Sequence, residues 1–186
     1  MITIGITGTI GAGKGTVVEY LKTQGFEHFS AREFLIKEVK KRGLELIRHN
    51  ITDVANDLRK QYFPGYIISE LLKQAEQHKG NRVIESIRTL GEIELLRQNG
   101  KNFYLFAVNA DLNLRYKRVV ERHSVTDNVS YEKFVEDEKR EYESVEPWSQ
   151  NLKGCIAQAD YVFGNNGTVE ELYKKIENTI QKIGFK

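Results

Sequence analysis

The chain is predicted to be an α/β protein built on a parallel β-sheet. Short apolar segments rich in β-branched and aromatic residues recur along it, and a longer stretch of helical periodicity follows each one. The first, third and fourth segments show little polar alternation, as do strands that helices cover on both faces. We predict strands at residues 2–7, 26–30, 82–86, 103–109 and 161–164.

Helical periodicity fills most of the remaining sequence. Asp111 and Thr168 are suited to N-cap positions, and Pro64 is suited to a first helical turn. Residues 31–80 and 111–158 hold more helix than one strand–helix unit requires, so they are either additional packing or a mobile binding arm and a lid. We predict helices at about 14–24, 32–42, 52–62, 65–78, 91–98, 112–123, 131–144 and 169–183.

Composition and charge narrow the class of protein. The 186 residues, 40% of them hydrophobic, are enough for a single domain spanning residues 1–186. A formal net charge of +2 lacks the basic excess expected of a protein that binds long nucleic acids. The one cysteine, Cys155, cannot form an internal disulfide, which favours a reducing compartment. The start of the chain has no leader-like pattern and no run of about 18 apolar residues occurs, so we expect a cytoplasmic protein without membrane partners, monomeric or a small homo-oligomer.

The most specific motif is GTIGAGKGT at residues 8–16, between the first predicted strand and an amphipathic helix. Its glycines let successive backbone N–H groups turn toward phosphate oxygens, and the helix N-terminus adds the positive end of its dipole. Lys14 is suited to the β and γ phosphates of ATP, and the Thr16 hydroxyl is suited to phosphate and Mg²⁺. The predicted nucleotide-binding residues of this loop are Gly8, Gly11, Ala12, Gly13, Lys14, Gly15 and Thr16.

The position of the hydroxyl residue separates this motif from the commoner phosphate loop. Gly15 follows the lysine where GxxxxGK[ST] has Ser or Thr, and Thr16 comes next. The resulting GxxGxGKGT resembles the loop of adenylate kinases and their relatives, which implies phosphoryl transfer to a small molecule. The resemblance also implies a three-layer P-loop NTPase fold with a five-stranded, mainly parallel sheet in the order 2-3-1-4-5. A lysine inside the loop excludes a dinucleotide-binding GxGxxG turn.

The segment HFSAREFL at residues 28–35 resembles the start of the acceptor-binding helices in nucleoside monophosphate kinases. Ile36 stands where adenylate kinases usually carry an arginine. The acceptor-phosphate contact would therefore pass to Arg32, Lys37 or Arg42. The departure leaves the identity of the acceptor open.

VIESIRTLGEIELL at residues 83–96 resembles the family's strand that ends in an acidic residue and is followed by an arginine. Glu85 replaces the usual aspartate and would orient a magnesium-bound water. Arg88 follows the carboxyl end of a central strand, where open α/β sheets bind ligands. The alternatives are a turn-capping role for Glu85 and a surface ion pair of Arg88 with Glu92 or Glu94.

Arg115, Arg118 and Arg122 are spaced to share one helical face. In the resembling kinases a comparable helix leads into the lid and brings arginines onto the transferring phosphoryl group. The alternative is a solvated face balanced by acidic residues such as Glu121. We favour Arg118 and Arg122 as the catalytic pair.

Two later segments carry further resemblances. Residues 131–148, YEKFVEDEKREYESVEPW, predict an ion-paired helix in which Glu136 and Arg140 lie at i,i+4. This segment resembles a helix of an archaeal family of adenylate-kinase-like and dephospho-coenzyme A kinase-like proteins, which implies that Arg140 faces phosphate. ADYVFGNNGTVEEL at residues 159–172 resembles the end of dephospho-coenzyme A kinases and implies Asn165 beside the adenine; the alternative is a simple asparagine turn.

These observations predict an ATP-dependent phosphotransferase that uses Mg²⁺ and acts on a small nucleotide acceptor, a nucleoside or deoxynucleoside monophosphate. Dephospho-coenzyme A is the alternative acceptor, and a P-loop ATPase acting as a regulatory switch is the alternative from another class. Lys14, Arg88, Arg118 and Arg122 are the predicted catalytic residues; Arg32, Glu85 and Arg88 bind the acceptor; Thr16 and Glu85 hold Mg²⁺, partly through water; and Asn165 joins the nucleotide-binding loop.

Overall fold

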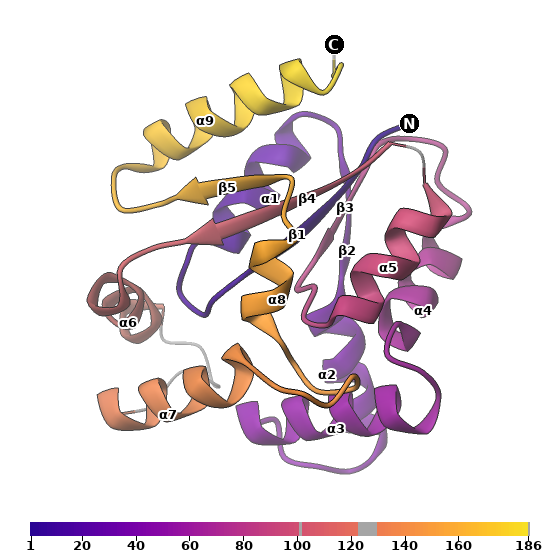
Figure 1. Cartoon of the computed structure of the whole chain (residues 1–186), viewed down its shortest axis with the longest axis vertical. Coiled ribbons are helices and arrows are strands. Elements are labelled where there is room, and N and C mark those ends of the chain that lie inside the picture. Colours follow the sequence, from indigo (N-terminus) through magenta and orange to yellow (C-terminus); the bar gives the residue numbers. More distant parts are fainter. Residues whose placement is uncertain (101, 123–129, 186) are drawn as a thin grey trace.

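The protein, a computed structural model, is described at residues 1–100, 102–122 and 130–185. Its centre is a five-stranded sheet in the order β2-β3-β1-β4-β5, in which every neighbouring pair is parallel (Figure 1). The predicted α/β P-loop fold and its strand order are therefore confirmed. The strands are β1 (Thr3–Gly8), β2 (Glu27–Ser30), β3 (Arg82–Glu85), β4 (Phe103–Asn109) and β5 (Tyr161–Gly164).

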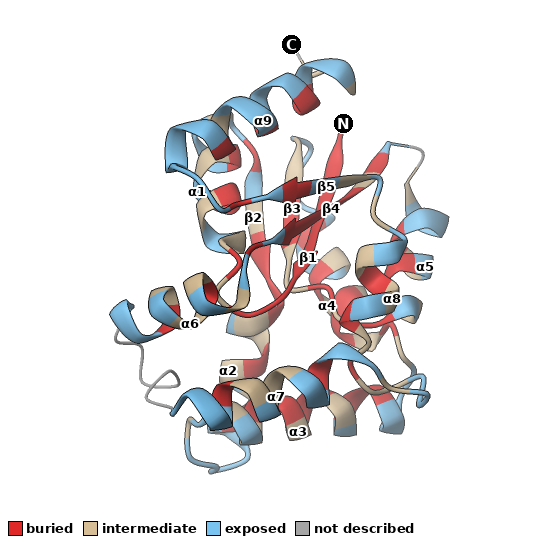
Figure 2. Cartoon of the chain, turned by 60° about the vertical axis from the view of Figure 1, so that its left-hand side comes forward, coloured by how far each residue is buried: buried red, intermediate tan, exposed pale blue. Residues whose placement is uncertain are grey.

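Helices cover both faces of the sheet and form the outer two layers (Figures 1 and 2). On one face, α1 (Lys14–Thr23) and α9 (Val169–Lys182) bury their apolar stripes against β1, β4 and β5. On the other face lie α4 (Tyr66–Ala75), α5 (Leu90–Asn99) and the short α8 (Leu152–Ala157). Strands buried on both faces explain why the central segments lack polar alternation.

The remaining helices lie beyond the carboxyl ends of the strands (Figure 1). These helices are α2 (Ala31–Lys41), α3 (Arg48–Gln61), α6 (Leu112–Glu121) and α7 (Tyr131–Tyr142). Within the sheet, Ile6 of β1 is in register with Glu85 of β3. This register places the residues that follow β1 beside the end of β3, which is where parallel sheets bind ligands.

The helix ends confirm two predicted N-cap positions and correct the place of Pro64. The Thr168 hydroxyl accepts from Glu171 N in a complete capping box. Asp111 occupies the N-cap position of α6, but its side chain makes no capping hydrogen bond. Pro64 precedes the helix that begins at Tyr66, because Gly65 is its N-cap.

The sequence analysis missed α8, because a helix of six residues interrupted by Gly154 is too short to show a period. The predicted end of a helix at 123 lies outside the described residues. In the described part of the chain, none of the helices has both the length and the apolar character needed to span a membrane.

Candidate active site

The loop of residues 8–16 connects β1 to α1 and adopts conformations that only glycine accepts readily. Gly8, Gly11 and Gly13 have φ values of 138°, 74° and 102°. A Cβ on Gly11 would lie 2.4 Å from Arg115 O, and one on Gly13 would lie 2.2 Å from Asn165 Nδ2. Gly15 differs, since a Cβ there would have no heavy atom within 4 Å. The first three glycines are therefore required by the loop itself, whereas Gly15 opens onto free space.

Lys14 folds back over this loop. Its ammonium donates to Gly8 O and Thr9 O, each at 2.8 Å. Burial lowers the pKa of Lys14 well below its usual value, and the positive charge of Arg88 lowers it further. A bound triphosphate would supply the negative charge that this buried cation needs.

A cavity of about 520 Å³ opens in front of the loop. The structure brings most of the predicted site residues together on its walls, whereas Gly8, Ala12 and Asn165 do not line it. The predicted residues that line it are Gly11, Gly13, Lys14, Gly15, Thr16, Arg32, Glu85, Arg88, Arg118 and Arg122. The same walls include Arg48, which the sequence analysis did not single out.

Asn165 contacts the phosphate loop but does not line the cavity. The side chain is only 6% exposed, and its amide donates to Ala12 O at 2.8 Å. Arg118 donates to Asn165 O at 2.9 Å while also lining the cavity. Asn165 therefore links the end of β5 to the phosphate loop and to α6, and a contact with adenine stays a prediction.

The two arginines of α6 and the arginine at its C-cap do not act alike. Arg115 is buried, donates to Ala110 O at 2.8 Å and pairs with Glu138 of α7. Arg118 and Arg122 instead line the cavity. The expected cationic stripe is thus reduced to these two residues, because Arg115 is used to join α6 to α7.

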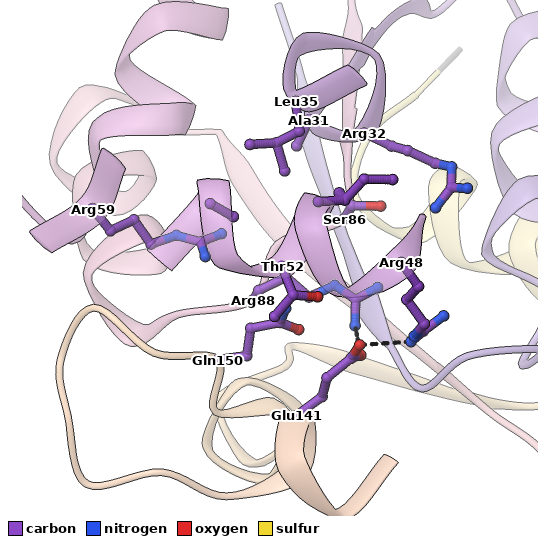
Figure 3. Close-up of a pocket in the computed structure, with 12 residues that line it drawn as sticks. Ala31, Arg32, Leu35, Arg48, Thr52, Arg59, Ser86, Arg88, Glu141 and Gln150 are labelled. Carbon is purple, nitrogen blue, oxygen red and sulfur yellow. Dashed lines mark hydrogen bonds and ion pairs between the residues drawn. The ribbon is translucent and has the colours of Figure 1, made fainter. Parts of the chain in front are cut away.

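Arg88 forms an ion pair with a buried carboxylate and not with one at the surface. Glu141, at the end of α7 and 5% exposed, accepts from Arg88 Nη1 at 3.0 Å and from Arg48 Nη2 at 2.6 Å (Figure 3). Burial alone would raise the pKa of Glu141, but the adjacent Arg88 and Arg48 together hold it below its usual value. Sequence reasoning missed Arg48 and Glu141, since no local pattern marks residues that meet across 93 positions.

The alternative for Arg88, a surface ion pair with Glu92 or Glu94, is not what the structure shows, because its guanidinium pairs with Glu141. Glu92 instead accepts from the backbone N–H groups of Arg88 and Thr89 and pairs with Arg59 at 2.8 Å. Both partners of that pair are almost fully buried. Glu92 fixes the turn that carries Arg88 into the cavity.

Glu85 and Thr16 offer the oxygen donors that suit Mg²⁺. Both residues line the cavity in front of the phosphate loop. The Glu85 carboxylate accepts from Ser86 Oγ at 3.3 Å and lies 3.9 Å from His28 Nε2. Among the described residues no cluster of three or more acidic, histidine or cysteine side chains could hold a metal, so Mg²⁺ would take its other ligands from phosphate and water.

Arg140 lies away from this cavity. It bonds Asp53 of α3 at 2.5 Å and His49 Nδ1 at 2.8 Å, and it lines a separate small hollow. Glu136, the expected i,i+4 partner of Arg140, bonds Lys133 instead at 3.1 Å. A contact between Arg140 and phosphate stays a prediction that these contacts do not support.

A second, smaller cavity of about 60 Å³ adjoins the first. Figure 3 shows the residues that line this smaller cavity. The two cavities share Arg32, Arg48, Ser86 and Arg88, whereas Glu141 lines the smaller one and not the larger. The smaller cavity lies between α2, α3 and the chain that follows α7. Its position fits the acceptor-binding arm predicted at residues 31–80.

Comparisons with known proteins agree with this fold. A family model described as an AAA domain matches residues 4–149. The UPF0200 protein MJ1399 of Methanocaldococcus jannaschii is 31% identical, with 98% of this chain and 91% of that protein covered. The crystal structure of TT1252 from Thermus thermophilus has a TM-score of 0.65 at 21% identity, covering 97% of both chains. Shikimate kinase from Bacteroides thetaiotaomicron has a TM-score of 0.62 at 10% identity, covering 97% of this chain and 98% of its own.

Proposed function

The chain belongs to the AAA domain family and to the UPF0200 family. From the geometry of its site we propose that it transfers the γ-phosphoryl group of ATP to a small nucleotide. The fold is a kinase-like P-loop fold. The proposed acceptor is a nucleoside or deoxynucleoside monophosphate. The working unit is a single domain of residues 1–186, with an acceptor-binding insertion at 31–80 and a lid at 111–158.

One observation carries the proposal: the cavity in front of the phosphate loop is lined by several cations from different elements. Lys14 comes from the loop, and five arginines, Arg32, Arg48, Arg88, Arg118 and Arg122, join it. Such a concentration of positive charge suits two phosphorylated ligands that meet end to end. It also suits the charge that spreads over the transferring phosphoryl oxygens, which positive donors stabilise.

Some residues of the site bind ATP, the phosphoryl donor, and others bind the monophosphate, the phosphoryl acceptor. Lys14 and the loop amides hold the triphosphate, with Asn165 near the adenine, while Arg32 and Arg88 hold the acceptor. Arg118 and Arg122 stabilise the transferring group. Mg²⁺, when bound, neutralises β and γ oxygens, and Thr16 and Glu85 hold it partly through water. A monophosphate acceptor is already ionised, so transfer to it needs no general base.

An acceptor screen tests the proposal. Purified protein is incubated with ATP and Mg²⁺ and each nucleoside monophosphate, deoxynucleotide or dephospho-coenzyme A, and both ADP and phosphorylated product are measured. Formation of a nucleoside diphosphate supports the proposal. Product from dephospho-coenzyme A supports the alternative acceptor, and ADP release that ignores every acceptor supports an ATPase switch.

Lys14→Ala provides the control for the site. We expect this variant to keep the fold, measured by circular dichroism, and to lose phosphoryl transfer by a hundredfold or more, on the order of the loss of one charged transition-state contact. Full activity in the variant would refute the assignment of the phosphate loop as the donor site.

A further inference from the structure

We infer that the smaller cavity binds the hydrogen-bonding edge of a nucleobase and that Gln150 determines which base is accepted. The inference rests on the proposed function, because it describes the acceptor of that reaction. Gln150 follows α7 in the chain and lies outside the insertion at 31–80.

The smaller cavity adjoins the larger one. It shares the side chains of Arg32, Arg48 and Arg88 with the larger cavity in front of the phosphate loop. An acceptor phosphate held by these arginines at the junction would face the donor. The remainder of the same molecule would then extend into the smaller cavity.

Part of the wall of the smaller cavity is apolar. Four apolar side chains from α2 and α3 line the cavity: Ala31, Leu35, Ile51 and Ala55. A flat, unsaturated ring gains from contact with such a surface, whereas a polyol would lose hydrogen bonds to water there.

Two residues that line the cavity, Arg59 and Gln150, each carry a buried polar side-chain atom. Arg59 and Gln150 are only 2% and 7% exposed. Arg59 Nη1 and Gln150 Oε1 are buried without a hydrogen-bond partner in the described part of the chain. Figure 3 shows both side chains reaching toward the cavity from different segments. One atom donates and the other accepts, so the matching ligand edge offers both an acceptor and a donor, as a nucleobase does.

Arg59 would offer a ligand one N–H donor, because Glu92 already balances the charge of its guanidinium group. Its Nε and Nη2 atoms already bond Glu92 Oε1, at 3.0 and 2.8 Å. The buried carboxylate balances the guanidinium, so the cavity end does not require an anion. This arrangement favours the neutral edge of a base at the Arg59 end and the phosphate at the Arg48 and Arg88 end.

Entry of a nucleoside requires room that the ligand-free protein lacks. A cavity of about 60 Å³ is well below the roughly 300 Å³ of the smallest usual ligand pockets. Glu141 lines this cavity and holds Arg48 and Arg88. A phosphate that takes over these two arginines would release the Glu141 side chain and enlarge the cavity.

The test uses calorimetric titration of AMP, GMP, CMP and UMP, without ATP, into the wild-type protein and two variants. Gln150→Leu removes the amide, and Gln150→Glu replaces it with a group that only accepts when ionised. Arg59 is not substituted, since its pair with Glu92 supports the fold. Gln74→Leu, at an exposed position on α4, is the matched control.

We expect the wild type to bind one monophosphate most tightly and Gln150→Leu to bind that one roughly tenfold or more weakly, the usual effect of losing a buried hydrogen bond. The other monophosphates should change much less, so base selectivity falls, whereas ATP affinity and the Gln74→Leu control stay at wild-type values. An equal effect on all four monophosphates, or none, would overturn the assignment of Gln150.

The outcome also separates this inference from the proposed function. Base-selective binding that depends on Gln150, combined with no phosphoryl transfer in the acceptor screen, would sustain the inference and reject the kinase. A wild-type protein that transfers phosphoryl groups but binds none of the four monophosphates would overturn the inference alone.

Discussion

Glu141 is ionised inside the protein because arginines from two separate elements surround it. Its pKa is lowered, so the stability it contributes is fully present above the unfolded carboxyl pKa and is lost as the pH falls through the folded pKa. This carboxylate bridges Arg48 and Arg88 and balances their positive charge.

Glu141→Gln should therefore lower the free energy of unfolding by about 3 kcal/mol at neutral pH, because two partly buried guanidinium groups lose their buried counter-charge. The variant should also lose less stability than the wild type on acidification. Added inorganic phosphate should stabilise it more than it stabilises the wild type. Urea unfolding across acidic and neutral pH, with and without phosphate, measures all three effects.

Glu143→Gln is the matched control, because Glu143 belongs to the same segment but pairs with Lys153 at the surface. It should change stability by less than about 1 kcal/mol. Equal losses in the two variants would mean that Glu141 is not a buried counter-ion.

Lys14 should take up protons when nucleotide binds. Its lowered pKa means that the folded protein binds fewer protons than the unfolded chain between the folded pKa and the ordinary value of 10.5, so this group's contribution to stability rises with pH in that window. A triphosphate would raise the pKa of Lys14 again. Calorimetry in buffers of different ionisation enthalpy should show more proton uptake by the wild type than by Lys14→Met, and equal uptake would assign the proton to another group.

At the scale of elements, the phosphate loop combines two kinds of glycine. Gly13 combines a positive φ with a close approach to Asn165, whereas Gly15 lies in the first turn of α1 with open space around its Cα. Sequence spacing alone does not distinguish these two positions.

Gly13→Ala and Gly15→Ala should therefore change the stability of the ligand-free protein in opposite directions. The first should cost about 1–3 kcal/mol, because alanine is strained at that φ and displaces the Asn165 amide. The second should stabilise α1 by up to about 1 kcal/mol, since alanine favours the helix more than glycine does. Urea unfolding of both variants measures the signs, and a stabilising Gly13→Ala would contradict the loop conformation.

At the scale of the whole molecule, the buried pair of Arg59 and Glu92 joins α3 to α5. Glu92 also holds the turn that positions Arg88. The pair thus connects α3 to the edge of the sheet and to the cavity that Arg88 lines.

Arg59→Ala should cost about 3–5 kcal/mol of unfolding free energy, because it leaves the Glu92 charge buried without its partner. Arg59→Met combined with Glu92→Leu should cost less than Arg59→Ala, since no unpaired charge remains. The surface pair of Arg42 with Asp57 gives the control, and Arg42→Ala should cost less than about 1 kcal/mol. A double variant less stable than Arg59→Ala would show that the pair stabilises the fold beyond charge balance.

The α/β class, the strand positions and the phosphate loop could all be predicted from the sequence alone. These features depend on local signals: apolar runs, helical period, and glycines around Lys14. The sequence also indicated Arg88, Arg118 and Glu85 as residues of the site. Residues that follow parallel strands or begin the next helices gather at one edge of the sheet.

Which charged residues face the cavity depends on tertiary contacts, which the sequence does not reveal. Arg115 and Arg118 lie on one helix three residues apart, yet the first is buried against Glu138 and the second lines the cavity. Arg48 and Glu141 meet across 93 positions, and Gln150 lines the smaller cavity from beyond α7. Charged residues look alike along a chain, because the partners that bury or expose them come from distant segments.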